Sequence, residues 1–223
     1  MNKISYLLLP FVFLFLTNCQ PKKSLRELGV KTNYDSFTLT SCDVMSTPIA
    51  KRINHHPEDY PFLDNAEIQL LDFISNGVTL TGFLAKPKKN GEFPIIIYNR
   101  GGNQEVGELL VGSAVEYMAP IAAEGYVVLA IDYQGINGGV ENEEFGGSDV
   151  GHLLNLIKSA KTLPFCDSSK IGLVGISRGG MMNYLIQKLA GDSIQIDASV
   201  NISAISDLEF SIQHHPQLED VCN

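Results

Sequence analysis

The stretch that decides the fold is KIGLVGISRGGMMNYL, residues 170–185. An apolar run leads into Gly-x-Ser-x-Gly at residues 175–179, and a helix-favouring segment follows. At a sharp turn between a buried strand and a helix, a serine is held out as a nucleophile, and flanking glycines let the two elements approach closely. The pattern therefore predicts Ser177 as a nucleophile, and the alternative is a tight turn with a spectator serine. Because a serine hydroxyl is too weakly acidic to react alone, its proton acceptor must lie elsewhere.

Apolar strands and helices alternate on both sides of this motif. We expect strands at 94–99, 126–132, 170–175 and 196–203, and helices at 105–124, 148–161 and 179–191. Short, wholly apolar strands that alternate with helices are typical of an α/β fold, a doubly wound and mostly parallel sheet covered on both faces. Ligands bind such sheets beyond the carboxyl ends of the strands, so the loops at 99–104, 132–139 and 175–179 are the candidate site.

A different pattern precedes these strands. Residues 66–75 and 78–87 are strand-like runs joined at Asn76-Gly77, which is a strong signal for a two-residue hairpin. A further strand is expected at 37–44. These segments predict an antiparallel start to the sheet.

The first residues predict export. Lys3 and an apolar run from Leu7 to Leu16 are typical of a secretory signal, and Leu16-Thr17-Asn18-Cys19 is similar to the motif at which a lipid is attached to cysteine. We expect a lipoprotein signal peptide at 1–18, a tether at 19–33, an N-terminal extension at 34–65 and the main domain at 66–223. The chain would then be an exported bacterial lipoprotein, held on a membrane by the lipid on Cys19 and facing the periplasm or the cell exterior. The alternative is a cleaved signal with an incidental cysteine.

Charge and cysteine content exclude some classes of partner. The formal net charge of −9 argues against nucleic acid, whose binding requires clustered Lys and Arg. Cys42, Cys166 and Cys222 allow at most one disulfide after processing at Cys19, and the pairing stays open. No Cys or His spacing suggests a metal, and no cofactor is expected.

Four motifs carry a family resemblance. They are Arg100-Gly101-Gly102, Asp132-Tyr133-Gln134-Gly135, the run from Phe145 to Val150, and the Gly175–Gly180 turn. On these motifs, residues 66–206 resemble the catalytic domain of the prolyl oligopeptidase family of α/β-hydrolases, which includes dipeptidyl aminopeptidases and acylaminoacyl-peptidases, and more broadly the dienelactone hydrolases. The resemblance implies acyl transfer from a small ester, amide or short peptide through a covalent serine intermediate.

Site residues follow from the resemblance position by position. Ser177 is implied as the nucleophile and the backbone N–H of Arg178 as one oxyanion donor, with the backbone of Arg100 or Gly101 as the second. Tyr98 is expected to pack rather than to donate. The side chains of Arg100 and Arg178 have two open roles: to bind an anionic group of the substrate, or to form salt bridges with Glu143, Glu144 or another nearby carboxylate.

The catalytic acid and histidine are harder to place. In this fold they follow later strands, and the segment after Ser177 is too short for two more strand–helix units. We therefore expect a C-terminal truncation, with the last strands, the acid and the histidine beyond Asn223, and an inactive chain as it stands. A compact triad of Ser177 with Asp207 and His214 or His215 is the less favoured alternative. His55, His56 and His152 are expected to be ordinary.

A competing class is a non-catalytic binding or structural protein that retains the hydrolase scaffold.

Overall fold

An eight-stranded sheet organises the part of the chain that the structure describes. The structure is a computed structural model, and it describes residues 24–104, 106–135, 139 and 142–218. The strand order is β1-β2-β3-β4-β6-β5-β7-β8. The strands are β1 Lys31–Asn33, β2 Phe37–Ser41, β3 Ala66–Ser75, β4 Val78–Pro87, β5 Phe93–Asn99, β6 Val127–Ile131, β7 Cys166–Ile176 and β8 Ala198–Ile202.

The first four strands form an antiparallel meander. The β3–β4 hairpin turns at Asn76 and Gly77, whose φ angles of 52° and 81° are both positive, as this two-residue turn requires. The predicted hairpin is therefore confirmed. β1 and β2 extend the same sheet, so residues 31–33 and 37–41, which lie in the expected tether and N-terminal extension, pair with the main sheet.

The other four strands run parallel to one another. β6 pairs antiparallel with β4 and so joins the two halves, while β5, β6, β7 and β8 pair in parallel. Every residue of β6 is buried, in agreement with the wholly apolar sequence. The predicted α/β fold with a mostly parallel sheet is confirmed in this half.

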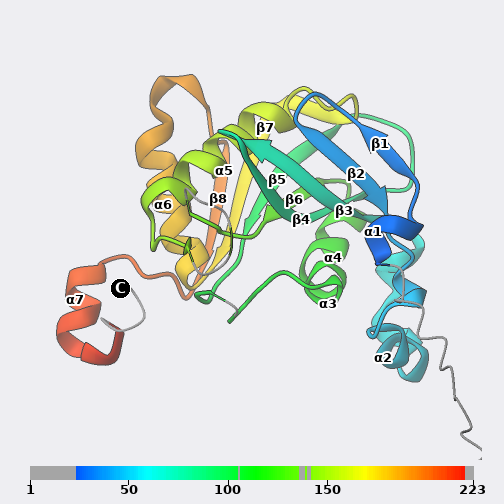
Figure 1. The fold of residues 1–223 in the computed structure, drawn as a ribbon, viewed down its shortest axis with the longest axis horizontal. Coiled ribbons are helices and arrows are strands. Elements are labelled where there is room, and N and C mark those ends of the chain that lie inside the picture. Colours follow the sequence, from blue (N-terminus) through cyan, green and yellow to red (C-terminus); the bar gives the residue numbers. More distant parts are fainter. Residues whose placement is uncertain (1–23, 105, 136–138, 140–141, 219–223) are drawn as a thin grey trace, which may run out of the picture.

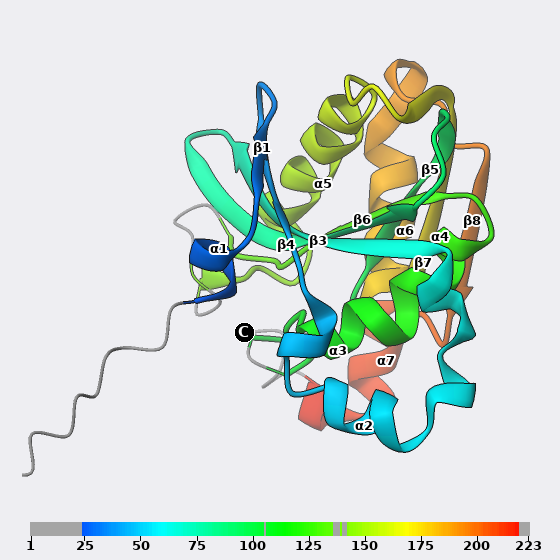
Figure 2. The same ribbon diagram turned by 90° about the vertical axis from the view of Figure 1, so that its right-hand side faces the viewer.

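Helices cover both faces of the sheet. They are α1 Leu25–Leu28, α2 Ala50–His55, α3 Val111–Ser113, the π-helical turn η4 Ala114–Met118, α4 Ala119–Ala123, α5 Gly147–Ala160, α6 Arg178–Ala190 and α7 Leu208–His214. Short 3₁₀ turns lie at η1 Val44–Ser46, η2 Pro57–Asp59, η3 Pro61–Asp64, η6 Gly191–Ser193 and η7 Pro216–Leu218. α5 and α6 lie on one face, and the stretch from α3 to α4 lies on the other (Figures 1 and 2).

Side chains of each buried strand alternate between two cores. On β6, Leu129 packs in the core with Leu153 and Met182 from α5 and α6. Its neighbour Val128 packs in the opposite core with Met118 and Ala122. This two-sided burial fixes the register of the central strands, because a slip of one residue would exchange the two cores.

One predicted helix begins later than expected. The helix expected at 105–124 starts at Val111, and the described residues before it, 100–104 and 106–110, form a loop beyond β5. Gly102 and Gly107 have φ angles of 79° and 91°, and a Cβ on Gly102 would lie 1.9 Å from the carbonyl oxygen of Val106. The glycines allow a tight backbone loop here instead of a helix, and this loop approaches the predicted nucleophile.

The β8 side of the molecule exposes apolar side chains. Val200 and Ile202 are 52% and 48% exposed, and α6 exposes Tyr184 and Leu189. α7 stands away from the sheet at this side (Figure 1). Among the described helices, none combines the length and the hydropathy that a membrane span requires.

Candidate active site

Ser177 occupies a strained turn between β7 and α6. Its φ and ψ are 55° and −119°, a conformation that L-residues rarely adopt. A Cβ on Gly175 would lie 2.3 Å from the carbonyl oxygen of Gly179, and a Cβ on Gly179 would lie 1.9 Å from that of Asn99. Both glycines are therefore required by close backbone contacts, as the sequence motif predicts. The surrounding structure holds the strain of Ser177 in place.

Two backbone segments converge on this serine. Arg178 begins α6, where backbone N–H groups have no acceptor within the helix and the helix dipole is positive. From the β5 side, a Cβ on Gly101 would lie 3.3 Å from Cβ of Ser177 and 3.0 Å from the carbonyl oxygen of Ile176. The structure thus brings Ser177, Arg178 and Gly101 together.

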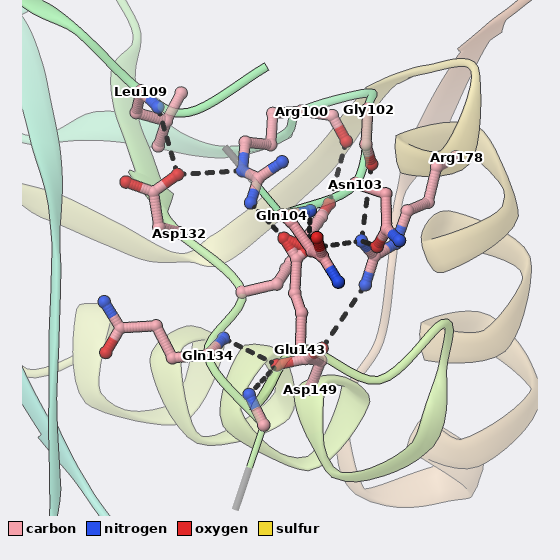
Figure 3. A network of polar contacts seen from close by, with 12 residues as sticks. Arg100, Gly102, Asn103, Gln104, Leu109, Asp132, Gln134, Glu143, Asp149 and Arg178 are labelled. Carbon is pink, nitrogen blue, oxygen red and sulfur yellow. Dashed lines mark hydrogen bonds and ion pairs between the residues drawn. The ribbon is translucent and has the colours of Figure 1, made fainter. Parts of the chain in front are cut away.

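The side chains of Arg100 and Arg178 point into the protein and share one carboxylate (Figure 3). Glu143 Oε1 lies 2.5 Å from Arg100 Nη2, and Glu143 Oε2 lies 2.6 Å from Arg178 Nη1. All three side chains are at most 2% exposed. Of the two roles left open by the sequence, the salt bridge to Glu143 is the one that the structure shows, and neither guanidinium is free to bind a substrate anion.

Two aspartates complete this buried ion network. Asp132 Oδ1 lies 2.8 Å from Arg100 Nε, and Asp149 Oδ2 lies 3.4 Å from Arg178 Nη2. Asp149 also accepts hydrogen bonds from the backbone N–H groups of Gln134 and Gly135, at 3.0 and 2.9 Å. The network therefore ties the loop after β6 to the loop after β5 and to the serine turn.

Tyr133 contacts both guanidiniums. Their Cζ atoms are 4.8 Å (Arg100) and 4.5 Å (Arg178) from its ring centroid, within the range of cation–π attraction. Its hydroxyl donates to the carbonyl oxygen of Arg100 at 3.1 Å. These contacts tie Tyr133 to both arginines, and burial raises the pKa of Tyr133 so that its hydroxyl remains protonated.

Burial also changes the acidity of the two aspartates. Desolvation raises the pKa of Asp132 to about 6, although the N–H of Leu109 and the charge of Arg100 act in the opposite direction. Desolvation likewise raises the pKa of Asp149, against the hydrogen bonds from Gly135 and Glu144. Both carboxyl groups therefore bind a proton at a higher pH than an exposed aspartate does, despite their salt bridges.

The sequence missed most of this network. The sequence predicts Glu143 as one possible partner of the arginines, whereas Asp132, Tyr133 and Asp149 stand in the family motifs without a predicted role. Their positions at the ends of β6 and at the start of α5 were the available signal, because parallel strands bring such loops to one edge.

The predicted acid and base candidates in the tail are not connected to Ser177. Asp207 caps α7 by accepting from the N–H of Phe210 at 2.8 Å. His214 Nδ1 lies 2.8 Å from the carbonyl oxygen of Phe210, and the two rings stack 4.0 Å apart. His215 is exposed at the end of α7. Within the described residues no hydrogen bond joins any of these three side chains to Ser177.

The other histidines have local roles. His152 is buried, with Nδ1 2.8 Å from Ser75 Oγ and Nε2 3.2 Å from the carbonyl oxygen of Gly135. His55, the last residue of α2, and His56, which follows it, contact each other. In the described ranges, no group of three or more His, Cys, Asp or Glu side chains could hold a metal ion. Cys42 and Cys166 carry free thiols, so they do not pair with each other, and Cys19 and Cys222 lie outside the described residues.

A pocket of about 410 Å³ opens beside Ser177. The loop after β5 contributes Gly102, Asn103, Gln104 and Val106, and the other elements contribute Phe145, Arg178, Ile205 and Leu218. Its volume lies at the small end of the range for ligand sites. Residues from separate parts of the chain thus form one cavity beside the strained serine.

Comparisons with known proteins agree with this geometry. The chain is 30% identical over 146 residues to the uncharacterized peptidase YtmA of Bacillus subtilis, covering 66% of this chain and 54% of that protein. It is 31% identical over 102 residues to dipeptidyl-peptidase 5 of Porphyromonas gingivalis, covering 43% of this chain and 15% of the relative. The chain therefore spans about half the length of the first relative and a small part of the second. No family model matches the chain.

Solved structures give the same fold. Esterase B of Lactobacillus rhamnosis superposes with a TM-score of 0.56 at 17% identity, over 78% of this chain and 59% of that one. Dipeptidyl peptidase 4 of Porphyromonas gingivalis superposes with a TM-score of 0.55 at 15% identity, over 76% and 26%. The fold and the serine turn thus define an α/β-hydrolase. The names of the two relatives, a peptidase and a dipeptidyl peptidase, support the resemblance to the prolyl oligopeptidase-like family of these hydrolases.

Proposed function

We propose that the protein is a serine hydrolase that cleaves small esters, amides or short peptides through an acyl-enzyme intermediate. The observation that carries this proposal is the conformation of Ser177, with φ and ψ of 55° and −119° at the start of α6 and at the wall of a pocket. Such strain persists only where the surrounding structure over-determines it, and it exposes the hydroxyl for attack.

Backbone N–H groups would stabilise the transition state. The oxygen of the substrate carbonyl becomes negative when Ser177 attacks, and preorganised donors at that position lower the barrier. The N–H of Arg178 at the start of α6 and the N–H of Gly101 in the adjoining loop are the proposed donors. The buried pairing of both arginine side chains with Glu143 holds these two backbone segments against each other.

The proton acceptor is a separate question. None of the five histidines makes a hydrogen bond to Ser177 in the described part of the chain, so the proposal rests on the serine turn and its pocket. This same observation favours the second candidate, a non-catalytic binding protein that keeps the hydrolase scaffold.

Hydrolysis assays on the full-length protein, meaning the natural gene product with any sequence that follows Asn223, separate the two candidates. The proposal expects release of p-nitrophenol from p-nitrophenyl esters or of p-nitroaniline from short peptide anilides, and its loss in Ser177→Ala. Ser169→Ala is the matched control, because Ser169 lies on the same strand but only bonds locally to Asp167. Activity that is unchanged in Ser177→Ala, or absent from a folded protein on every substrate, would favour the binding protein.

We further propose that Cys19, outside the described residues, carries a lipid that anchors the protein to a membrane after export. The support is the sequence alone: an apolar run of signal-peptide length that ends at Leu16-Thr17-Asn18-Cys19.

A further inference from the structure

The pocket beside Ser177 is lined by apolar side chains from separate segments. Val106 comes from the loop after β5, Phe145 from the segment before α5, Ile205 from the segment after β8 and Leu218 from η7. Phe145 and Ile205 also pack against the main core, which holds them in place. A carbon chain in this pocket would contact side chains on several sides, and its burial would be favourable.

The described wall of the pocket has no charged group that is free to pair with a substrate. Among the described lining residues, Arg178 is the one with a charged side chain. Its side chain is 1% exposed and is paired with Glu143 and Asp149, and its Cζ lies 4.7 Å from the ring centroid of Phe145. An anionic substrate group would therefore meet no free cation in the described wall, and desolvating an unpaired charge is unfavourable.

Among the described lining residues, none offers a carboxylate to a cationic group. Glu143 is fully buried between the two arginines, and Glu144 accepts from the N–H of Ser148 at 2.5 Å. Neither carboxylate lines the pocket. The α-amino group of a free amino-acyl substrate would therefore have no counter-ion among the described lining residues.

On this geometry we propose that the pocket binds the acyl part of the substrate, and that this acyl part is an uncharged, apolar chain of short to medium length. The assignment rests on the proposed function of Ser177. In the first step, Ser177 Oγ bonds to the acyl carbon, the bond from that carbon to the leaving oxygen breaks, and the serine proton ends on the departing alcohol. In the second step, water adds to the acyl carbon and releases the carboxylic acid and the free serine.

The test compares p-nitrophenyl esters that share one leaving group. The full-length protein is mixed with the acetyl, butyryl, octanoyl, hemisuccinyl and alanyl esters. Release of p-nitrophenol and the acyl adduct on the Ser177 peptide are both measured, and each rate is divided by the spontaneous hydrolysis rate of that ester. We expect the butyryl and octanoyl esters to acylate Ser177 at least about tenfold faster than the two charged esters.

The outcomes separate the two proposals. If the charged esters acylate Ser177 as fast as the apolar ones, the pocket assignment is wrong while the nucleophile stands. If no ester and no fluorophosphonate modifies Ser177, both are wrong.

Variants in the wall give a second readout. Ile205→Trp narrows the pocket and should lower the ratio of octanoyl to acetyl acylation about tenfold. Because Ile205 also packs on the core, the test is repeated with Val106→Trp, at a position that is 75% exposed. Val30→Trp is the matched control, since Val30 is 76% exposed and does not line the pocket. An unchanged ratio in both folded wall variants would overturn the assignment.

Discussion

The carboxylate of Glu143 bridges Arg178 and Arg100, with one oxygen 2.6 Å from the first guanidinium and the other 2.5 Å from the second. Arg178 follows the proposed nucleophile directly, and Arg100 precedes the loop that packs against it. One buried side chain from a third segment therefore sets the relative position of both sides of the site.

Replacing this carboxylate should weaken the fold and the site together. In Glu143→Gln, two buried guanidiniums lose their shared counter-ion, which we expect to lower the free energy of unfolding by about 3–5 kcal/mol. A displaced oxyanion loop should also slow the modification of Ser177, by up to about a hundredfold. Urea unfolding and labelling rates measure the two effects, and Glu92→Gln on an exposed turn is the control. A variant as stable and as reactive as the parent would show that the bridge has no such role.

Asp132 predicts a dependence of stability on pH. Burial raises its pKa from 3.8 to about 6 in the folded protein, so the folded state holds a proton that the unfolded state has released between these values. The contribution of Asp132 to the free energy of unfolding is therefore fully present below pH 3.8, and it is lost as the pH rises through about 6. We expect Asp132→Asn to remove its part of this slope, on the order of 1–3 kcal/mol between pH 4 and 6. Urea unfolding midpoints of the parent and the variant at several pH values measure this slope. An unchanged slope in Asp132→Asn would contradict the raised pKa of Asp132.

Two glycines on helices offer a matched pair. Gly179→Ala places a methyl group 1.9 Å from the carbonyl oxygen of Asn99, so strand and helix must separate. We expect a loss of about 1–3 kcal/mol in the free energy of unfolding. Gly151→Ala, within α5, has no atom within 4 Å of the added methyl and should instead stabilise by about 0.5–1 kcal/mol. Equal effects of the two changes in thermal unfolding would argue against the close approach at the serine turn.

Lipid attachment at Cys19 can be measured independently of catalysis. In a bacterial host, the protein should incorporate labelled palmitate and sediment with membranes, because acyl chains supply the anchoring free energy. Cys19→Ala should abolish the incorporation, whereas Cys42→Ala should retain it. Palmitate on neither the parent nor the control would show that the motif is not processed in this way.

Much of the fold follows from local sequence patterns. The hairpin at Asn76-Gly77 and the buried strands have signals that span only a few residues, and the serine turn is fixed by its flanking glycines. The helix start at Val111 was missed because the loop before it depends on a close backbone contact between Gly102 and Val106. A contact of this kind is set by the folded loop and leaves no periodicity in the sequence.

The site was less predictable than the fold. The sequence left open whether Arg100 and Arg178 bind a substrate anion or a carboxylate, because the answer depends on how the segment of Glu143 folds back between them. The apolar pocket was not anticipated either, since Phe145, Ile205 and Leu218 meet only in the tertiary structure. Patterns of residue type locate the ends of strands, but the contacts between the loops that follow them are long-range.

The most direct test of the central claim is covalent labelling of the full-length protein with a fluorophosphonate, followed by peptide mass spectrometry. The account predicts one adduct, on the peptide that contains Ser177, which disappears in Ser177→Ala and persists in Ser169→Ala. A folded protein that stays unlabelled where a known serine hydrolase reacts, or that is modified at another serine, would contradict it.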